Sequence, residues 1–208
     1  MTAVPGLFVI HNVFHQQEED WLCEQIEKDP KKHPCRQIHY AYEYGWKFLP
    51  ILRKTVQDDY GVFPSWIQFI GQKIKQNDAC KTILQGFLTD FYTHADHVLL
   101  NIYSPGEGCV PHTDEVHFWN EWVIGVSLHS DCIMRMSYSP HHQNFYVDVP
   151  LPHGSVYILT GQARYIWQHA IVGSSITQKR YSITLRSINS RYLPYKAKKF
   201  SEEEEGSL

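Results

Sequence analysis

The chain lacks the features of a membrane-spanning, secreted or strongly basic protein. No run of 18 apolar residues occurs in its 208 residues, so we expect no helix that crosses a membrane. The apolar segment 7–10 is short and has no basic lead-in, so we expect no secretory signal. A net charge of −3 argues against a surface coated in positive charge. With 43% hydrophobic and 20% charged residues, the composition instead favours one domain with a well-buried core.

Cysteine is scarce, and its spacing is irregular. The chain has five cysteines, an odd number, and no C-x-x-C pair. This pattern argues against a disulfide framework and against a structural zinc site. We therefore expect a reducing compartment, which means the cytoplasm, the nucleus or both.

Helix patterns precede strand patterns along the chain. An acidic start at 18–20 leads into an apolar stripe with Leu22 and Ile26, which predicts a first helix. Pro64 precedes a second apolar stripe, which predicts another. The later runs, rich in Val, Ile, Tyr and Leu and separated by turn residues, indicate an antiparallel sandwich or barrel. The order predicts an α+β fold with N-terminal helices packed on one face of a double sheet. The expected strands are 98–103, 122–128, 133–138, 145–149, 155–159, 169–172 and 180–188.

Two of the expected strands carry polar residues on one face. Side chains two residues apart point the same way, so one strand places Asn101 and Tyr103 together, and another does the same for Arg180 and Arg186. An arginine aimed into a sheet interior is costly unless it meets an anion. Two arginines on one face therefore predict a dianionic ligand. The alternative places both arginines on a solvent-facing side.

His-x-Asp pairs supply candidate metal ligands. Two imidazoles and one carboxylate are the usual ligands of a non-haem Fe(II) oxygenase. The turn Pro-Gly-Glu-Gly leads back beside the strand of Asn101 and Tyr103, which favours His112 and Asp114 as two of the ligands. A chain with 13 histidines also contains such pairs by chance. The two pairs we expect to be chance occurrences, in a loop and in a surface turn, are His94–Asp96 and His129–Asp131.

A third ligand must come from a distant strand. His169 lies in a strand-like run shortly before Arg180, so it is the favoured candidate. His117 and His129 are not excluded by their patterns. The histidines that we expect in turns or loops are His141, His142 and His153.

The features occur in a fixed order that resembles a known family. The set consists of Asn101-x-Tyr103, the Pro-Gly-Glu-Gly turn, His112-x-Asp114, His169, and Arg180-x5-Arg186. It resembles the AlkB family of Fe(II)- and 2-oxoglutarate-dependent dioxygenases, over roughly residues 36–188. The segment 160–169 is especially similar to the AlkB-type domain of the animal tRNA wobble-uridine hydroxylase.

The resemblance implies a fold and a metal site. The fold would be a double-stranded β-helix, a relative of the jelly roll, which encloses a site between two sheets. His112, Asp114 and His169 would hold Fe(II). The domain would span residues 1–195, with a lid region at about 36–60 and a catalytic core at about 97–188. We expect the polar tail at 196–208 to be disordered.

The resemblance also implies two cosubstrates, 2-oxoglutarate and O2. Arg180 would pair with the distal carboxylate of 2-oxoglutarate, helped by Asn101 and Tyr103. Arg186 would lie near the carboxylate and keto group that chelate iron. Arginine forms a forked, charge-assisted pair with a carboxylate, which agrees with these roles. The expected products are succinate, CO2 and an oxidised substrate.

The segment 36–47 offers a hypothesis about the substrate. Its aromatic residues fall on every second position, so on an extended flap they would form one face that stacks bases. The segment resembles the nucleotide-recognition lid of AlkB enzymes. Residues 28–54 carry seven basic against two acidic residues, which favours phosphate contacts. The alternative is an aromatic strand packed on the core. The candidate substrate residues are Arg36, Tyr40, Tyr42, Tyr44, Trp46 and, as an acceptor for an amino group or as a solvated acid, Glu115.

The leading hypothesis is a dioxygenase that hydroxylates or oxidatively demethylates a modified base in nucleic acid. We expect RNA, including tRNA, in preference to DNA, a monomeric protein, and a possible protein partner that delivers the substrate. One alternative is the same chemistry on a protein side chain. Another is a non-enzymatic binding module that has kept the fold. A zinc hydrolase is disfavoured because it offers no reason for the two arginines.

Overall fold

The computed structural model describes residues 3–30, 40–49, 54–57, 63–85, 95–138 and 145–189. Arg36, parts of the expected lid and the tail 196–208 lie outside these residues. In the described ranges, no helix has the length and apolarity needed to cross a membrane.

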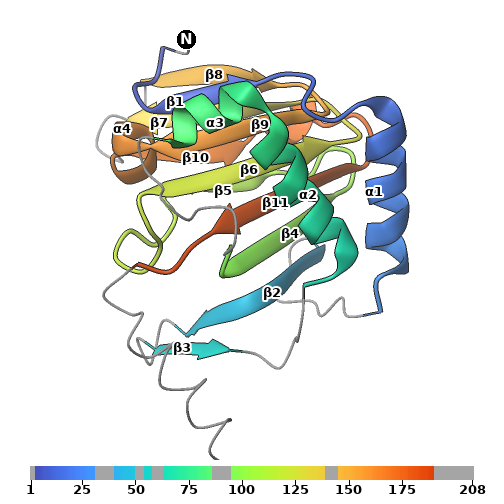
Figure 1. Cartoon of the computed structure of the whole chain (residues 1–208). Helices are drawn as coiled ribbons and strands as arrows, with labels where there is room; N and C mark the ends of the chain where they lie inside the picture. The colour runs from blue at the N-terminus through green and yellow to red at the C-terminus, as the bar shows by residue number, and fades with distance from the viewer. Residues whose placement is uncertain are drawn as a thin grey trace, which may run out of the picture.

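Two antiparallel sheets face each other (Figure 1). The order in the larger sheet is β1-β9-β6-β11-β4-β2-β3, and in the smaller β5-β10-β7-β8. The bounds are β1 (Leu7–Ile10), β2 (Tyr40–Leu49), β3 (Lys54–Gln57), β4 (His97–Tyr103), β5 (Cys109–His112), β6 (Trp122–Leu128), β7 (Cys132–Tyr138), β8 (Tyr146–Leu151), β9 (Ser155–Thr160), β10 (Trp167–Ile171) and β11 (Arg180–Arg186). The predicted antiparallel double sheet is confirmed.

Helices cover the outer face of the larger sheet. Figure 1 shows α2 lying across the strands, with α1 beside it. Apolar residues of both helices share a core with the sheet, which confirms the predicted packing of the N-terminal helices. The helices are α1 (Gln16–Lys28), α2 (Ser65–Gln76), α3 (Asp78–Leu84) and α4 (Gly161–Tyr165).

Strand alternation divides β4 between two environments. Val98 and Leu100 belong to the core beneath the helices, whereas Tyr103 belongs to a second core between the sheets. Because successive side chains point to opposite faces, the residues that share the side of Tyr103 look into the space between the sheets. This space contains the candidate site.

A buried carboxylate ties α1 to two strand connections. Glu19 accepts a hydrogen bond from the backbone N–H of His129 at 2.8 Å, and Nδ1 of His153 lies 2.7 Å from its other oxygen. The hydrogen bond to Glu19 raises the pKa of His153. His129, left open as a ligand by the sequence, lies in the turn after β6 with a φ of 74° and is not part of the His-Asp-His cluster.

This pair predicts a pH-dependent contribution to stability. Because the folded-state pKa of His153 is raised, the contribution is fully present below the pKa of an ordinary histidine and is lost as pH rises through the folded value. In urea unfolding between pH 5.5 and 8.5, His153→Gln should lower the free energy of unfolding most at the acidic end. We expect less than about 1 kcal/mol, as for other partly exposed pairs. A difference that does not vary with pH would contradict this assignment.

Candidate metal centre and anion pocket

A cavity of about 290 Å³ lies between the two sheets. It is lined by strands β2, β4, β9 and β11 of the larger sheet, by β5 and β10 of the smaller sheet, and by the loop after β5. Residues that are far apart in the sequence therefore meet in one place. The lining residues used below are Glu43, Leu99, Asn101, Tyr103, His112, Asp114, Glu115, Trp119, Tyr157, His169, Thr184 and Arg186.

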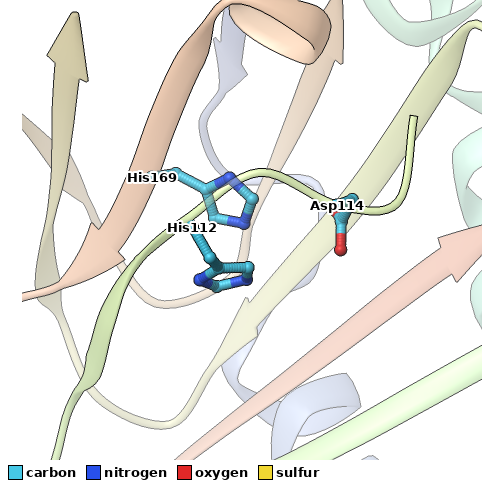
Figure 2. A group of neighbouring side chains, drawn as sticks. All are labelled: His112, Asp114 and His169. Atoms are coloured by element: carbon cyan, nitrogen blue, oxygen red, sulfur yellow. The ribbon is translucent and has the colours of Figure 1, made fainter. Parts of the chain in front are cut away.

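The structure brings His112, Asp114 and His169 together at this cavity. His112 ends β5 and pairs in register with His169 on β10, so their imidazole centroids lie 4.3 Å apart. Asp114 follows in the loop after β5. One potential ligand atom from each residue lies within 4.8 Å of the others. Figure 2 shows the two rings side by side, with Asp114 across from them on that loop.

The protonation states of this triad suit a divalent cation. Burial lowers the pKa of His169 to about 4, so the imidazole is neutral at pH 7. Burial alone would raise the pKa of Asp114, but nearby positive charge, above all that of Arg186, lowers it to about 2. One Asp114 oxygen pairs with Arg186, and the other is buried without a hydrogen-bond partner in the described chain. A neutral imidazole, an ionised carboxylate and an unpartnered oxygen fit Fe(II) well.

The tautomer of His112 is set by the backbone. Nδ1 of His112 lies 2.9 Å from the carbonyl oxygen of Val110. If Nδ1 carries the proton and donates it to this carbonyl, Nε2 keeps its lone pair. The strand geometry therefore leaves Nε2 of His112 available to a metal.

A buried guanidinium lies on the face of β11 that looks towards the space between the sheets. Arg180 is 0% exposed, and its Nε donates to Ser127 Oγ at 3.1 Å. Both terminal nitrogens lack a hydrogen-bond partner among the described residues. Strand pairing places Arg180 opposite Tyr103 and Ser182 opposite Asn101. A guanidinium that is desolvated and left with free donors is costly, so the pocket is suited to a carboxylate.

Arg186 lies at the other end of β11. It forms an ion pair with Asp114, and its Nε has no hydrogen-bond partner in the described chain. Its guanidinium carbon lies 5.6 Å from the ring centroid of Trp119. The structure thus places all four residues expected to bind 2-oxoglutarate on the cavity side of the larger sheet, with Arg186 against the metal triad.

Sequence reasoning missed Arg164 on α4. This buried side chain donates from Nη1 to the carbonyl of Asp114 and from Nη2 to the carbonyl of Glu115, both at 2.9 Å. It therefore fixes the backbone of the loop that carries the carboxylate ligand candidate. Arg164 belongs to the segment 160–169 noted for its resemblance, but no local pattern links it to a loop 50 residues earlier in the sequence.

Arg164→Met should weaken metal binding without removing a ligand. Loss of an outer contact that orients a ligand commonly costs about 10–100-fold in metal affinity. Titration of the protein with Fe(II) or Mn(II) under anaerobic conditions would measure the loss. Arg135→Met is a matched control because this half-exposed arginine of β7 pairs with Asp148, at 2.7 Å. Unchanged affinity in Arg164→Met would contradict the positioning role.

The described residues of β2 do not form the predicted aromatic face. The strand alternates normally up to Tyr44, with Tyr42 and Tyr44 towards the core beneath the helices and Glu43 towards the cavity. Gly45, with a left-handed φ of 80°, interrupts the alternation before Trp46. Tyr44 is 1% exposed in the core beneath the helices, and its hydroxyl donates to Asp29 at 2.9 Å. Trp46 is 6% exposed and packs with Phe118 in a separate cluster. The prediction of one exposed, base-stacking face is therefore wrong for Tyr44 and Trp46.

The other candidate substrate residues lie in different environments. Tyr42 is half-buried and packs against the core beneath the helices, on the side away from the cavity. Glu115 lines the cavity with an exposed side chain and accepts a hydrogen bond from the N–H of His117 at 3.2 Å. Arg36 and the side chain of Tyr40 lie outside the described part of the chain. Glu43, between the two tyrosines, lines the cavity instead.

Comparisons with known proteins agree with this geometry. The 2OG-Fe(II) oxygenase superfamily matches residues 6–186. The tRNA (carboxymethyluridine(34)-5-O)-methyltransferase ALKBH8 of Macaca fascicularis is 26% identical over 178 residues, which are 80% of this chain and 24% of that protein. The chain thus spans about a quarter of the length of this relative. The uncharacterized protein L905 of Acanthamoeba polyphaga mimivirus is 35% identical over 199 residues, covering 88% of this chain and 85% of that protein.

A solved structure shows the same fold. The structure of OsALKBH1 aligns with a TM-score of 0.62 at 15% identity, covering 90% of this chain and 99% of that one. This match confirms the predicted double-stranded β-helix. The family match spans most of the chain, and the described residues contain a His-Asp-His cluster that could hold a metal ion. The protein therefore belongs to the 2OG-Fe(II) oxygenase superfamily, is an oxidoreductase, and is homologous to ALKBH8 and other AlkB homologues.

Proposed function

We propose that the protein uses Fe(II), 2-oxoglutarate and O2 to hydroxylate or oxidatively demethylate a modified base in nucleic acid, with RNA preferred over DNA. One observation carries the proposal: a His-Asp-His cluster that could hold a metal ion and a buried guanidinium with two unpartnered nitrogens face the space between the same two sheets. A metal alone would need the triad but not the guanidinium. A dianion that also chelates the metal needs both.

Separate groups of residues would bind the metal and the cosubstrate. His112, Asp114 and His169 would hold the iron, and Arg180 would bind the distal carboxylate of 2-oxoglutarate, with Asn101 and Tyr103 beside it. When bound, iron and 2-oxoglutarate supply the O2-dependent oxidation that yields succinate and CO2 and hydroxylates a substrate carbon. If that carbon is a methyl on nitrogen, the hydroxylated product releases formaldehyde. The Arg186 charge keeps Asp114 ionised.

Two observations support nucleic acid as the substrate. The macaque relative is by name a tRNA-modifying enzyme, although this chain spans only a quarter of it. The segment 28–54 carries seven basic against two acidic residues in a chain of net charge −3. The single domain over 1–195, the monomeric state, the delivery partner and the cytoplasmic or nuclear location stay predictions.

Coupled turnover tests this proposal. The protein would be incubated with Fe(II), 2-oxoglutarate and O2 together with cellular RNA, matched DNA, or a peptide mixture. We expect succinate formation to rise with RNA, and mass spectrometry to show a modified base that loses a methyl group or gains oxygen. Oxidation of the peptides with no change in any base would contradict the proposal.

A further inference from the structure

A tyrosine ring crosses a glycine on the cavity side of the larger sheet. Tyr157 of β9 lies opposite Gly125 of β6, which in turn lies opposite Thr184 of β11. A Cβ atom built on Gly125 would overlap Cζ, Cε1 and the hydroxyl oxygen of Tyr157. The ring therefore occupies the space that a side chain at position 125 would otherwise fill.

The ring is held at both ends. Tyr157 is 5% exposed and belongs to the core between the sheets. Its hydroxyl forms a hydrogen bond with the side chain of Thr184, and both residues line the cavity. If the ring turned aside, this bond would break and leave buried hydroxyl groups without their partner, which costs free energy. The ring is therefore a fixed part of the cavity wall.

Tyr157 reaches the middle of the expected cosubstrate site. Its partner Thr184 lies on β11 between Arg180 and Arg186, and all three side chains share one face because they are spaced by even numbers of residues. Burial raises the pKa of Tyr157, the charge of Arg180 lowers it, and the charge of Asp114 raises it. The hydroxyl thus feels both the guanidinium and the metal triad.

A 2-oxo diacid in this cavity would be held at both of its ends. Arg180 would bind the distal carboxylate, and the metal would bind the keto acid end, so a longer diacid would have to bow sideways. On the side of β4, Leu99 and Asn101 line the cavity. On the side of β6, Gly125 has no side chain, so the ring of Tyr157 forms the wall there.

We propose that Tyr157 is a specificity-determining residue for the cosubstrate, because its ring fills the space over Gly125 and limits the accepted 2-oxo diacid to the length of 2-oxoglutarate. Without the ring, the bare glycine would leave room for the bowed chain of a longer diacid. This inference rests on the proposed use of 2-oxoglutarate and adds the residue that sets its length.

Two keto acids of different length test the inference. 2-Oxoadipate is identical to 2-oxoglutarate except for one additional methylene group. Binding of each would be measured by calorimetric titration of the Mn(II)-loaded protein, and independently by the anaerobic absorption band with Fe(II). We expect the unaltered protein to bind 2-oxoadipate about 10-fold or more weakly, as for one misfitting methylene in a close-fitting pocket.

The main variant is Tyr157→Leu, whose shorter side chain does not span Gly125. It should reduce the preference for 2-oxoglutarate about 10-fold, because the additional methylene then finds space. Tyr157→Phe retains the ring and should retain most of the preference. Tyr146→Leu makes the same exchange at an exposed tyrosine of β8 outside the cavity, so it should leave the preference unchanged.

The ratio of the two affinities separates selection from a structural role. A tyrosine that only supported the fold would weaken both keto acids alike when replaced, and the ratio would stay the same. Circular dichroism would verify that Tyr157→Leu is folded. If it is not, Tyr157→Met takes its place with the same expected ratio, since methionine adapts to irregular cores.

The outcomes also separate this inference from the proposed function. If the unaltered protein binds both keto acids equally, or the ratio is unchanged in the folded variant, the inference is overturned and the proposed function stands. A Tyr157→Phe protein as permissive as Tyr157→Leu would also overturn it, since the ring would not be the wall. If neither keto acid binds to the metal-loaded protein, both the inference and the proposed function fail.

Discussion

Arg180→Met is expected to abolish 2-oxoglutarate binding and at the same time to stabilise the protein when no cosubstrate is present. The guanidinium is fully buried with two unpartnered nitrogens, so it costs free energy until an anion arrives. Replacement by an apolar side chain of similar length should raise the free energy of unfolding by about 1–3 kcal/mol. Loss of a buried, forked ion pair should weaken 2-oxoglutarate binding by about 100-fold or more. Urea unfolding and calorimetric titration measure the two effects.

A loss of 2-oxoglutarate affinity together with a gain in the free energy of unfolding distinguishes an arginine that binds a ligand from one that supports the fold. Arg135→Met removes a half-exposed arginine and should change neither quantity by a comparable amount. Arg180→Lys keeps the charge but not the forked geometry, so its 2-oxoglutarate affinity should lie between those of the unaltered protein and Arg180→Met. A strongly destabilised Arg180→Met protein would indicate that the guanidinium supports the fold instead.

Asp114→Ala is expected to remove metal binding and to destabilise the protein even without metal. The carboxylate is a candidate ligand and also the counter-charge of the buried Arg186. Breaking a buried pair from one side leaves an uncompensated charge, which costs about 3–5 kcal/mol. We expect Mn(II) affinity to fall by at least about 100-fold. Glu115→Ala, which removes the adjacent exposed acid, should change stability little.

A double variant separates the two roles of Asp114. Asp114→Ala combined with Arg186→Met removes both charges, so stability should recover by about 2 kcal/mol or more while metal binding stays lost. In the unaltered protein, the Asp114 pKa of about 2 means that the stabilising contribution is present above the ordinary aspartate pKa and is lost as pH falls towards 2. No recovery in the double variant would contradict the charge-pairing account.

Much of the fold was predictable because short runs of β-branched, aromatic and other apolar residues, bounded by turn residues, indicate strands directly. The strands β4, β6, β7, β9 and β11 are such runs, and each lies within two residues of its expected bounds. By contrast, β5 is four residues long and contains Pro111, and two of its residues are exposed. Such a segment becomes a strand through its pairing with β10, a long-range contact that no local pattern carries.

The candidate site also contains residues that the sequence predicted and residues that it did not. The triad and the arginine face were predictable because residue type and two-residue alternation both constrain them. Arg164 and Glu43 were not, since tertiary contacts with distant segments bring each to the site. The aromatic alternation in β2 was misleading because Tyr42 and Tyr44 face the core beneath the helices, and the left-handed Gly45 then places Trp46 in a different buried cluster.

Anaerobic titration with Fe(II) and 2-oxoglutarate tests the central claim most directly. The claim is that one metal and one keto-diacid share the cavity between the sheets. The account predicts an absorption band that needs both additions, saturates at one iron and one 2-oxoglutarate per chain, and is absent in His169→Ala and Arg180→Met. A band that persists in both variants, or 2-oxoglutarate that binds as tightly to the metal-free protein as to the metal-loaded protein, would contradict it.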